Sequence, residues 1–522
     1  MNSDRPLIES ECVVPPPTRS WSTTALSWGM PRLQELLFIA LFLVVVSLGP
    51  RLLNVDGDLG RHITVGNAIL EDRSIPIRDI FSHSMEGEPL TPHEWLAQVI
   101  YALAYRGMGL DGVVILCGFL IAVTFILVYR QAYERSQLLF VSLGITLLGV
   151  AASSLHWLAR PHLFTLLLMA VWVGELERIW QGKCNRWWVL PLIMLTWANL
   201  HGAFLAGFVV WGIYWTCAML EHFISGSQST GRGNQVLRSL SLGGGLALAV
   251  TLVNPVGWRL WETSLEFLRS EYLVSHTAEY LPPDFHSANA WPFLMMVIGS
   301  ILLFGLSRRQ TELPHLLIVA SWTAMAIYSQ RNIPLYAVVA SPILAWVTAN
   351  VVRESPRLNG WLRFDARLAS TEASLRGGFW PVIVVLLVVV ALFKGVNLDI
   401  ALQGNRFDPT IFPVQAVDWM ESQPIPGSGF NYFPWGGYLL FRRWPEEKVF
   451  IDGQTDFYGE QLTRQYEHVI TLGIGWQDVL RQYGIRWVLM PPGSKLAKAL
   501  LDEPGWRPAY QDRTAIYLRY EP

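Results

Sequence analysis

The stretch Leu33–His62 reads LQELLFIALFLVVVSLGPRLLNVDGDLGRH and joins a long apolar run to two aspartates. Residues 33–52 are apolar and long enough for a helix to cross a bilayer, which takes about 20 residues. Asp56 and Asp58 follow at the point where this span leaves the membrane. Because a carboxylate beside hydrocarbon is costly, an acidic pair in this position indicates a functional site.

Similar apolar runs recur along the whole chain of 522 residues. Hydrophobic residues make up 52% of the sequence and charged residues only 15%, whereas a soluble protein carries about 25% charged residues. We therefore predict an all-α polytopic membrane protein with about eleven transmembrane helices. The predicted spans are 33–52, 110–129, 138–156, 162–179, 188–201, 202–222, 238–253, 291–307, 313–329, 333–350 and 379–396. The net charge of −2 says little about partners, and no basic run suggests nucleic acid as one.

Lys and Arg residues in the short loops predict how the chain is oriented. They fall on one side of the predicted spans and comprise Arg5, Arg19, Arg32, Arg130, Arg135, Lys183, Arg186, Arg232, Arg238, Arg308, Arg309, Arg353, Arg357, Arg363, Arg367 and Arg376. This side is expected to be cytoplasmic, and it includes the N-terminus. With an odd number of spans, the C-terminus then lies outside. No small-residue cleavage pattern follows the first span, so we expect it to be retained.

Three parts follow from this topology: a cytoplasmic tail (1–32), a transmembrane domain (33–396) and an extracytoplasmic α/β domain (397–522). In the last part, hydrophobic periodicity predicts helices at 412–422, 459–471, 475–483 and 494–502. It predicts strands at 428–432, 449–452, 486–490 and 515–519.

The first outer loop, residues 54–95, is the longest polar interruption between the predicted spans. Amphipathic spacing predicts two interfacial helices, at 60–71 and 94–106, joined by an ordered connection. Trp95, Tyr101 and Tyr105 suit the membrane surface, where aromatic residues are enriched.

Polar residues gather at the outer ends of the predicted spans. Beside Asp56 and Asp58 the set comprises His62, His93, Glu94, His156, Arg160, His162, Asn199, His201, Asn254, Arg259, Glu279, Asp284, Arg331 and Asn332. Structural roles would account for single members, since Asp often caps a helix and Arg can pair with a carboxylate or reach the interface. Arginine at an outer end runs against the positive-inside bias. The whole set on one side therefore predicts one outer polar cavity.

Carboxylates and arginines together suit group transfer from a phosphate-linked donor. A carboxylate can take the proton of an acceptor hydroxyl and make its oxygen a better nucleophile. Arginine binds phosphate bidentately and would stabilise the charge on the leaving phosphate. Metal chemistry is the alternative: Asp56, Asp58 and Glu94 offer oxygen ligands for Mg²⁺ or Mn²⁺, and His62, His93 and His162 would suit zinc. The sequence contains no tight ligand motif, so the metal is left unknown.

Several short stretches of the sequence carry a family resemblance. They are Asp56-Gly-Asp58-Leu-Gly-Arg-His62, Ile75-Pro76 with Asp79-Ile-Phe-Ser82, His93-Glu94-Trp95-Leu96, Arg160-Pro161-His162, Trp197-Ala-Asn199-Leu-His201-Gly202, Asn254-Pro255 with Gly257-Trp258-Arg259, Arg331-Asn332-Ile-Pro334, Trp435-Gly436-Gly437-Tyr438 and Phe450-Ile-Asp452-Gly453. With these, the chain resembles the GT-C superfamily of membrane glycosyltransferases, and within it a group of bacterial integral membrane proteins, most of them uncharacterised.

The resemblance implies transfer of a sugar from a polyprenyl-phosphate carrier at the outer membrane face. It implies that Asp58 or Asp56 is the catalytic base or a ligand, with a slight preference for Asp58. The residues expected to bind substrate are His62, His93, Glu94, Arg160, His162, Asn199, His201, Arg259, Arg331 and Asn332. Glu279 or Asp284 would correspond to a second acidic residue that several superfamily members carry in a later outer loop.

We therefore expect a glycosyltransferase integral to the bacterial cytoplasmic membrane, with a glycan, lipid or protein acceptor. Two other classes stay open. A flippase or transporter for a lipid-linked substrate would use the intramembrane polar residues as a path. A non-catalytic assembly protein of the cell envelope would use the C-terminal domain to bind a partner.

Overall fold

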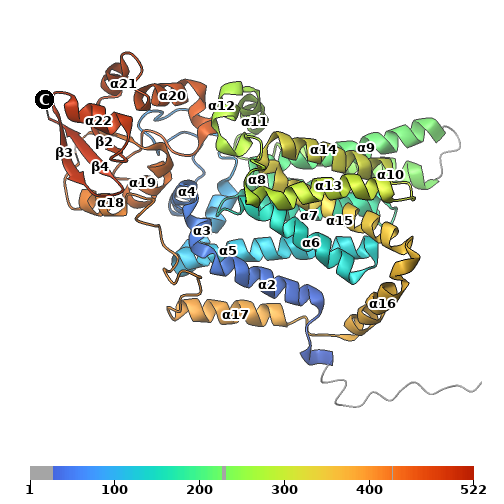
Figure 1. Ribbon diagram of the computed structural model, residues 1–522. Helices are drawn as coiled ribbons and strands as arrows, with labels where there is room; N and C mark the ends of the chain where they lie inside the picture. The colour runs from blue at the N-terminus through green and yellow to red at the C-terminus, as the bar shows by residue number, and fades with distance from the viewer. Residues whose placement is uncertain (1–26, 226–230, 426, 522) are drawn as a thin grey trace, which may run out of the picture.

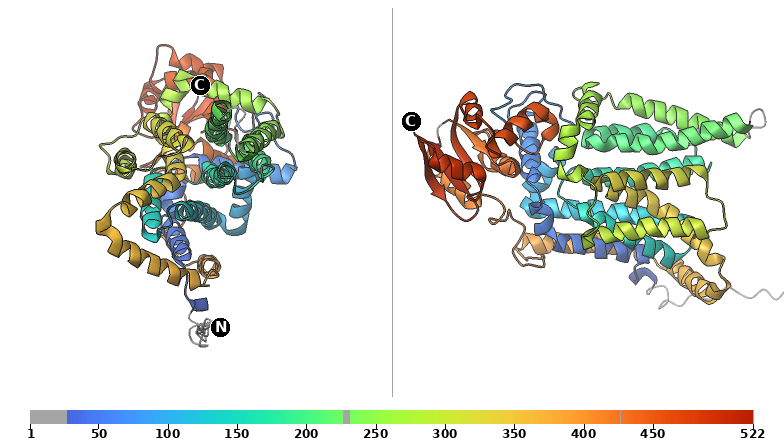
Figure 2. Two further views of the ribbon diagram at one scale, coloured as in Figure 1. Left: turned by 90° about the vertical axis from the view of Figure 1, so that its right-hand side faces the viewer. Right: turned by 45° about the horizontal axis from the view of Figure 1, so that its top comes forward.

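A computed structural model describes residues 27–225, 231–425 and 427–521 of the chain. Most of the predicted cytoplasmic tail, residues 1–26, lies outside the described residues. A bundle of roughly parallel helices forms the membrane body, and a small domain containing a β-sheet lies at one end of it (Figures 1 and 2).

The membrane body contains a helix in each of the eleven predicted spans. These helices are α2 (Leu33–Ser47), α5 (Trp95–Ser136), α6 (Leu139–Ser153), α7 (His162–Trp180), α8 (Val189–Leu200), α9 (Leu205–Ser225), α10 (Gly231–Val250), α13 (Trp291–Leu306), α14 (Leu313–Tyr328), α15 (Ile333–Arg353) and α17 (Trp380–Phe393). Six described helices are long and apolar enough to cross a membrane, and α8, α14 and α17 are shorter apolar helices. The chain is thus an integral membrane protein, and the count of eleven spans stays a prediction.

Short helices connect or flank the long ones. They are α3 (Gly49–Asn54), α4 (Asp58–Asp72), η1 (Ser154–His156), η2 (Gly202–Phe204), α11 (Arg259–Arg269), α12 (Glu271–His276), η4 (Ala278–Tyr280), η5 (Ala288–Ala290), η6 (Gln330–Asn332), η7 (Pro356–Leu358) and α16 (Asn359–Ser374).

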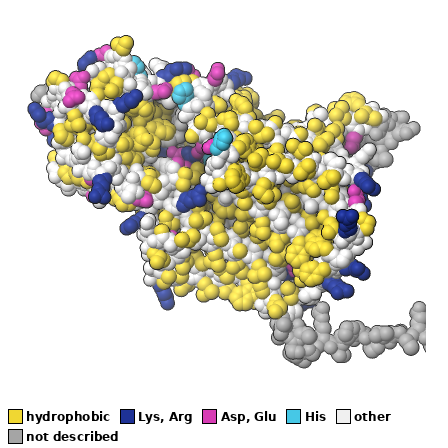
Figure 3. All heavy atoms as spheres, viewed as in Figure 1, with side chains coloured by type: hydrophobic (Ala, Val, Ile, Leu, Met, Phe, Trp, Pro, Cys, Tyr) yellow, Lys and Arg dark blue, Asp and Glu magenta, His cyan; other side chains and the backbone are white. Residues whose placement is uncertain are grey.

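The core of the membrane body is α15, which packs against α5, α6, α7, α13 and α14. Nearly every residue of its first four turns is buried. Four helices of the body, α13, α14, α15 and α17, begin with a proline in the first turn. Proline is accommodated there because its missing N–H would have no partner within the helix. Hydrophobic side chains cover the visible face of the body, whereas Lys and Arg gather at the end away from the C-terminal domain (Figure 3).

The first outer loop contains the two helices that its periodicity predicts, although both differ from simple interfacial helices. The first, α4, is largely buried between α5 and the C-terminal domain. The second continues into the next predicted span, because α5 runs on through a kink at Met108 and Gly109. Gly109 has a φ of 62°, a conformation that glycine adopts without strain. Tyr101, which we expected at the membrane surface, is fully buried.

The C-terminal domain combines helices with a four-stranded sheet of order β1-β2-β4-β3. β1 and β2 are parallel, and the other neighbours are antiparallel. The elements are α18 (Val414–Glu421), β1 (Ser428–Asn431), η8 (Phe433–Trp435), α19 (Gly436–Arg443), α20 (Thr455–Ile470), α21 (Trp476–Gln482), β2 (Ile485–Met490), α22 (Lys495–Asp502), β3 (Trp506–Gln511) and β4 (Ile516–Tyr520).

The helices predicted in this domain and three of its four predicted strands are confirmed, but the strand at 449–452 is wrong. The Asn431 side chain bonds to the backbone of this segment instead, accepting from the Phe450 N–H and donating to the Ile451 carbonyl, both at 2.8 Å. The pattern also missed α19 and β3. α19 begins with two glycines, which weaken a helix signal, and β3 contains Pro508, which edge strands tolerate.

Candidate active site

The acidic pair lies where α4 meets the C-terminal domain. α3 ends at Asn54 and α4 begins at Asp58, so the turn between them holds Asp56 and Gly57. Asp56 Oδ1 accepts a hydrogen bond from the backbone N–H of Asp58 at 3.0 Å. A side chain at position 57 would place its Cβ 1.9 Å from the Pro434 carbonyl oxygen. Glycine therefore lets the C-terminal domain approach the turn closely, and one oxygen of Asp56 is occupied by the first backbone N–H of α4.

Arg160 brings three carboxylates together. Its Nε lies 3.2 Å from Asp56 Oδ2, and its two terminal nitrogens contact Asp58 and Glu279. The Tyr101 hydroxyl donates a hydrogen bond to the Arg160 carbonyl at 2.9 Å and so fixes the backbone that carries the guanidinium. The cluster draws on three distant segments: the α3–α4 turn, the connection before α7, and η4.

The three carboxylates do not share this cation equally. Burial raises the pKa of Asp56, and Arg160 counteracts only part of that effect. Burial also raises the pKa of Glu279, but Arg160 and His156 outweigh it and lower this pKa to about 2. Asp56 Oδ2 is buried and lacks a hydrogen-bond partner among the described residues, despite its closeness to Arg160. Of Asp56 and Glu279, Asp56 therefore has the greater tendency to take up a proton.

A second polar group surrounds Glu94, the residue that precedes α5. Its carboxylate lies 3.7 Å from His62 Nδ1, 3.9 Å from His93 Nε2 and 3.5 Å from His201 Nε2. His93 also faces the C-terminal domain, where its Nδ1 lies 3.4 Å from Asp456 Oδ2. The structure thus brings together the predicted residues His62, His93, Glu94 and His201.

Burial and charge give the members of this group different protonation tendencies. Burial raises the pKa of Glu94. Burial and the neighbouring Arg61 lower the pKa of His62 to about 3, so this imidazole is neutral. Burial lowers the pKa of His93, but Asp456 and Glu94 outweigh it and leave this pKa above its usual value. His93 is therefore the histidine of the group that favours the charged form.

Residues of the C-terminal domain complete the site. Arg61 of α4 forms a buried ion pair with Asp452, its Nε lying 3.1 Å from Oδ1, and also contacts Gln454. A Cβ at Gly453 would lie 1.6 Å from Asp58 Oδ1. The loop between α19 and α20 therefore lies directly against the acidic pair, and only glycine fits next to Asp58.

Backbone pairing joins the first outer loop to the same domain. The His83 N–H donates to the Val449 carbonyl at 3.0 Å, and the Val449 N–H donates to the Phe81 carbonyl at 3.1 Å. Charged side chains and histidines gather in the hollow between the two parts of the molecule (Figure 3). The C-terminal domain is thus held beside the site by main-chain as well as side-chain bonds.

The sequence reasoning missed Asp452, Gly453, Gln454 and Asp456 as parts of the site. Phe450-Ile-Asp452-Gly453 carries the family resemblance, but it was assigned to a separate domain. Two signals were available: acidic residues beside a glycine, and the pair Gly436-Gly437, since glycines often mark close approach of two backbones. In the structure a Cβ at Gly437 would lie 2.2 Å from the Gly57 carbonyl oxygen.

Arg331 is a predicted substrate-binding arginine whose guanidinium is not paired with a carboxylate of the described chain. Its guanidinium lies over the Tyr280 ring, 4.4 Å from the ring centre. Its charge nonetheless acts on the cluster, because it helps to lower the pKa of Glu279. Among the described side chains, no carboxylate lies within 4.0 Å of Arg331, in contrast to Arg160.

The other predicted residues have contacts of a structural kind. Asn199 accepts a hydrogen bond from the Trp95 indole at 2.8 Å. His162 bonds to a backbone carbonyl of η1 at 2.9 Å, and Asn332 donates to a backbone carbonyl of α14 at 3.1 Å. Arg259 begins α11, and no contact in the described part of the chain joins it to this set.

The later outer loop supplies Glu279 and not Asp284. Glu279 contacts Arg160 and lies 3.8 Å from His156. Asp284 is exposed and accepts a hydrogen bond from the His286 backbone N–H. Of these two acidic residues, Glu279 is therefore the one that lies in the Arg160 cluster.

The residues considered as metal ligands do not form one set. Asp56 and Asp58 face Arg160, whereas Glu94 faces histidines. The zinc set is divided too, since His162 contacts η1 and the other two histidines contact Glu94. Within the described ranges, no three His, Cys, Asp or Glu side chains converge as metal ligands would. We derive no step through a metal.

Comparison with known proteins identifies the fold. No protein-family model matches the sequence, and no curated protein matches it either. Among solved structures, the oligosaccharyltransferase of Archaeoglobus fulgidus, tethered with an acceptor peptide, aligns with a TM-score of 0.53 at 11% identity. The alignment covers 88% of this chain and 69% of that one, and the apo form gives a TM-score of 0.52.

An arabinofuranosyltransferase from Mycobacteria aligns with the same TM-score of 0.53, at 11% identity. That alignment covers 95% of this chain and 40% of the larger protein. At such identities the likeness shows the fold alone. The chain accordingly has the fold of the GT-C membrane glycosyltransferases.

Proposed function

We propose that the protein transfers a sugar from a polyprenyl-phosphate donor to an acceptor at the extracytoplasmic membrane face. The observation that carries the proposal is the Arg160 cluster, in which Asp56 has a raised pKa and an oxygen without a hydrogen bond. A carboxylate of this kind is suited to accept a proton. The GT-C fold, shared with two glycosyltransferases, supports the same reaction class.

In the proposed reaction, Asp56 takes the proton of an acceptor hydroxyl. The acceptor oxygen then forms a bond to the anomeric carbon of the donor sugar, and the bond between that carbon and the phosphate oxygen breaks. The phosphate leaves with the electron pair of the broken bond and stays on its lipid. The proton ends on Asp56, so atoms and charge balance without a further reactant.

We assign the base to Asp56 rather than to Asp58, which the sequence slightly favoured. Asp58 contacts Arg160 and is covered by Gly453, so an acceptor would have to displace the C-terminal domain to reach it. The Asp56 side chain as a whole is 26% exposed, against 13% for that of Asp58, while its unbonded Oδ2 is buried in the cluster. We assign Asp58 and Glu279 to holding Arg160 in place beside the base.

We assign Arg331 to the leaving phosphate. Arginine is the side chain that pairs best with phosphate oxygens, and no described carboxylate competes for Arg331. Its stacking on Tyr280 orients the guanidinium. Charge-assisted bonds to a developing anion are among the strongest contributions to catalysis.

Transfer from labelled polyprenyl-phosphate sugars tests the proposal. We expect Asp56→Asn to lower the rate by about 100-fold or more, the usual contribution of a general base. Asp284→Asn is the matched control, because it makes the same charge change on an exposed residue of the later outer loop. An Asp56→Asn variant that keeps more than a third of wild-type activity at equal expression removes the proposed base.

The same preparation in sealed vesicles separates the transporter class. A donor that crosses the vesicle membrane without losing its sugar supports transport, whereas a labelled acceptor supports transfer. Deletion of the C-terminal domain would not separate the two classes, because it would remove the partner of Arg61 and uncover Asp58.

A further inference from the structure

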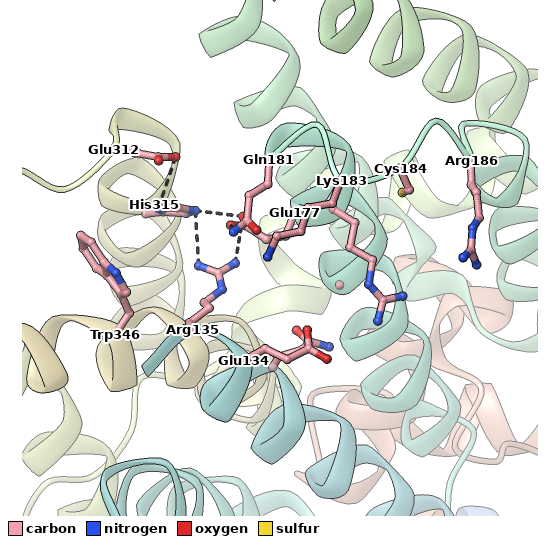
Figure 4. A pocket seen from close by; sticks show the side chains of 13 residues that line it. Glu134, Arg135, Glu177, Gln181, Lys183, Cys184, Arg186, Glu312, His315 and Trp346 are labelled. Carbon is pink, nitrogen blue, oxygen red and sulfur yellow. Dashed lines mark hydrogen bonds and ion pairs between the residues drawn. The ribbon is translucent and has the colours of Figure 1, made fainter. Parts of the chain in front are cut away.

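A cavity of about 410 Å³ lies at the end of the membrane body opposite the C-terminal domain. Its walls come from the end of α5, the end of α7, the connection from α7 to α8, and the beginning of α14 (Figure 4). Clefts that hold small ligands measure about 300–1,000 Å³. The cavity is therefore large enough for a lipid head group, and it is separate from the candidate active site.

The inner wall of this cavity is electrically balanced. Arg135 lies 2.9 Å from Glu177, and His315 bonds to the same carboxylate at 2.9 Å. The Tyr214 hydroxyl donates to Glu177 at 2.7 Å, and Gln181 contacts its other oxygen. Figure 4 shows Arg135, Glu177, Gln181 and His315 directed toward one another, so these residues hold the helices together.

The rim of the cavity is not balanced. Lys183 and Arg186 come from the connection between α7 and α8, and both are exposed. No carboxylate in the described part of the chain lies within 4.0 Å of either, whereas Arg178 pairs with Glu175 at 2.6 Å. Two exposed carboxylates also line the cavity: Glu312, which lies 3.9 Å from His315 Nδ1, and Glu134, which has no cation within 4.0 Å among the described residues and opposes Lys183 and Arg186. The unpaired lining groups are thus two cations and one anion.

Apolar side chains next to the rim fit a membrane surface. Trp188 and Leu192 are 53% and 54% exposed in and after the same connection. Tryptophan is enriched where a membrane meets water, and exposed leucine on a membrane helix faces lipid chains. The position therefore offers apolar contact for acyl chains beside a cationic rim.

We propose that this cavity binds the phosphate-bearing head group of an anionic membrane phospholipid, with Lys183 and Arg186 as its phosphate contacts. Basic pockets between transmembrane helices at the cytoplasmic side can bind anionic lipid head groups. The Lys and Arg distribution predicts that this end of the body is cytoplasmic. The lipid would bridge α5, α7 and α14 at their common end. The proposal is independent of the proposed glycosyl transfer.

Lipid retention by the purified full-length protein, measured by native mass spectrometry with phosphatidylglycerol, tests the proposal. We expect Lys183→Ala with Arg186→Ala to weaken phosphatidylglycerol binding by about 30-fold, since each cation near a membrane contributes roughly one factor of five. The matched control, Arg308→Ala with Arg309→Ala, removes two exposed cations from the same end outside the cavity. The control is expected to change binding by less than about threefold.

The Glu134→Gln variant should change phosphatidylglycerol binding in the opposite direction, and it removes no cation. Removing the like charge should tighten phosphatidylglycerol binding by roughly threefold. Equal binding by wild type and the Lys183/Arg186 variant overturns the proposal, as does an equal loss in the Arg308/Arg309 control. Equal retention of phosphatidylcholine overturns recognition of net negative charge. Displacement of the lipid by inorganic phosphate at equal concentration overturns the assignment of a lipid as the ligand and indicates that the cavity binds a soluble anion.

Discussion

The two buried arginine clusters at opposite ends of the membrane body differ in charge balance. Arg135 meets one carboxylate, Glu177, whose remaining bonds come from neutral or titratable donors. Arg160 meets three carboxylates and leaves Asp56 Oδ2 without a hydrogen bond among the described residues. A stable core needs no surplus of negative charge, because buried charges are costly unless paired. The Arg135 cluster is thus a balanced ion pair of the fold, whereas the Arg160 cluster holds a surplus of negative charge beside the proposed base.

Replacing either arginine with methionine, in Arg135→Met or Arg160→Met, should have the largest effect on stability. Arg135→Met leaves Glu177 buried without its cation and should cost about 3–5 kcal/mol of unfolding free energy. Adding Glu177→Gln should restore most of that stability, because the pair is then removed as a unit. Arg160→Met with Asp58→Asn should recover little, because Asp56 and Glu279 still repel each other. Thermal unfolding of the four variants measures both recoveries, and equal recovery at the two ends contradicts the distinction.

Gly453→Ala should disturb only the cluster under the C-terminal domain. Its Cβ would overlap Asp58 Oδ1, and overpacking of this kind typically costs about 1–3 kcal/mol. We expect lower thermal stability and lower transfer activity together. Gly493→Ala is the control, since a Cβ there meets nothing within 4 Å. If both alanine variants behave like wild type, the domain does not press on the acidic pair.

The smallest expected effect concerns pH and the contact between His93 and Asp456. The pKa of His93 is raised in the folded protein, so the ion pair stabilises fully below the unfolded value of about 6.5. That stabilisation is lost as pH rises through the folded pKa. Asp456→Asn should therefore lower stability by about 1 kcal/mol at pH 6 and by less at pH 8.5.

Unfolding measured at the two pH values checks this sign. Asp478→Asn provides the control, because Asp478 pairs with Arg481 in the same domain and no histidine takes part in that pair. A loss at Asp456 that is equal at both pH values would mean that His93 does not carry the charge.

The apolar runs of the sequence predicted a helix in every span, because membrane helices depend on local hydrophobicity. Placing Asp56, Asp58 and Arg160 at the same outer end also predicted that they would gather. The contact between Asp452 and Arg61 could not be predicted this way, since periodicity reports only on near neighbours. The segment 449–452 was misread for the same reason: its partners are the Asn431 side chain and the first outer loop, rather than a neighbouring strand.

Arg61 and Asp452, which pair in the finished site, are 391 positions apart in the chain. A ribosome adds about 5–20 residues per second, so Arg61 waits roughly 20–80 s for its carboxylate. During that interval the helices of the body are made, and the C-terminal domain does not yet cover the turn that holds Asp56 and Asp58. Each newly made molecule therefore acquires a finished centre only after Asp452 has been made, and a chain that terminates before Asp452 inserts into the membrane without one.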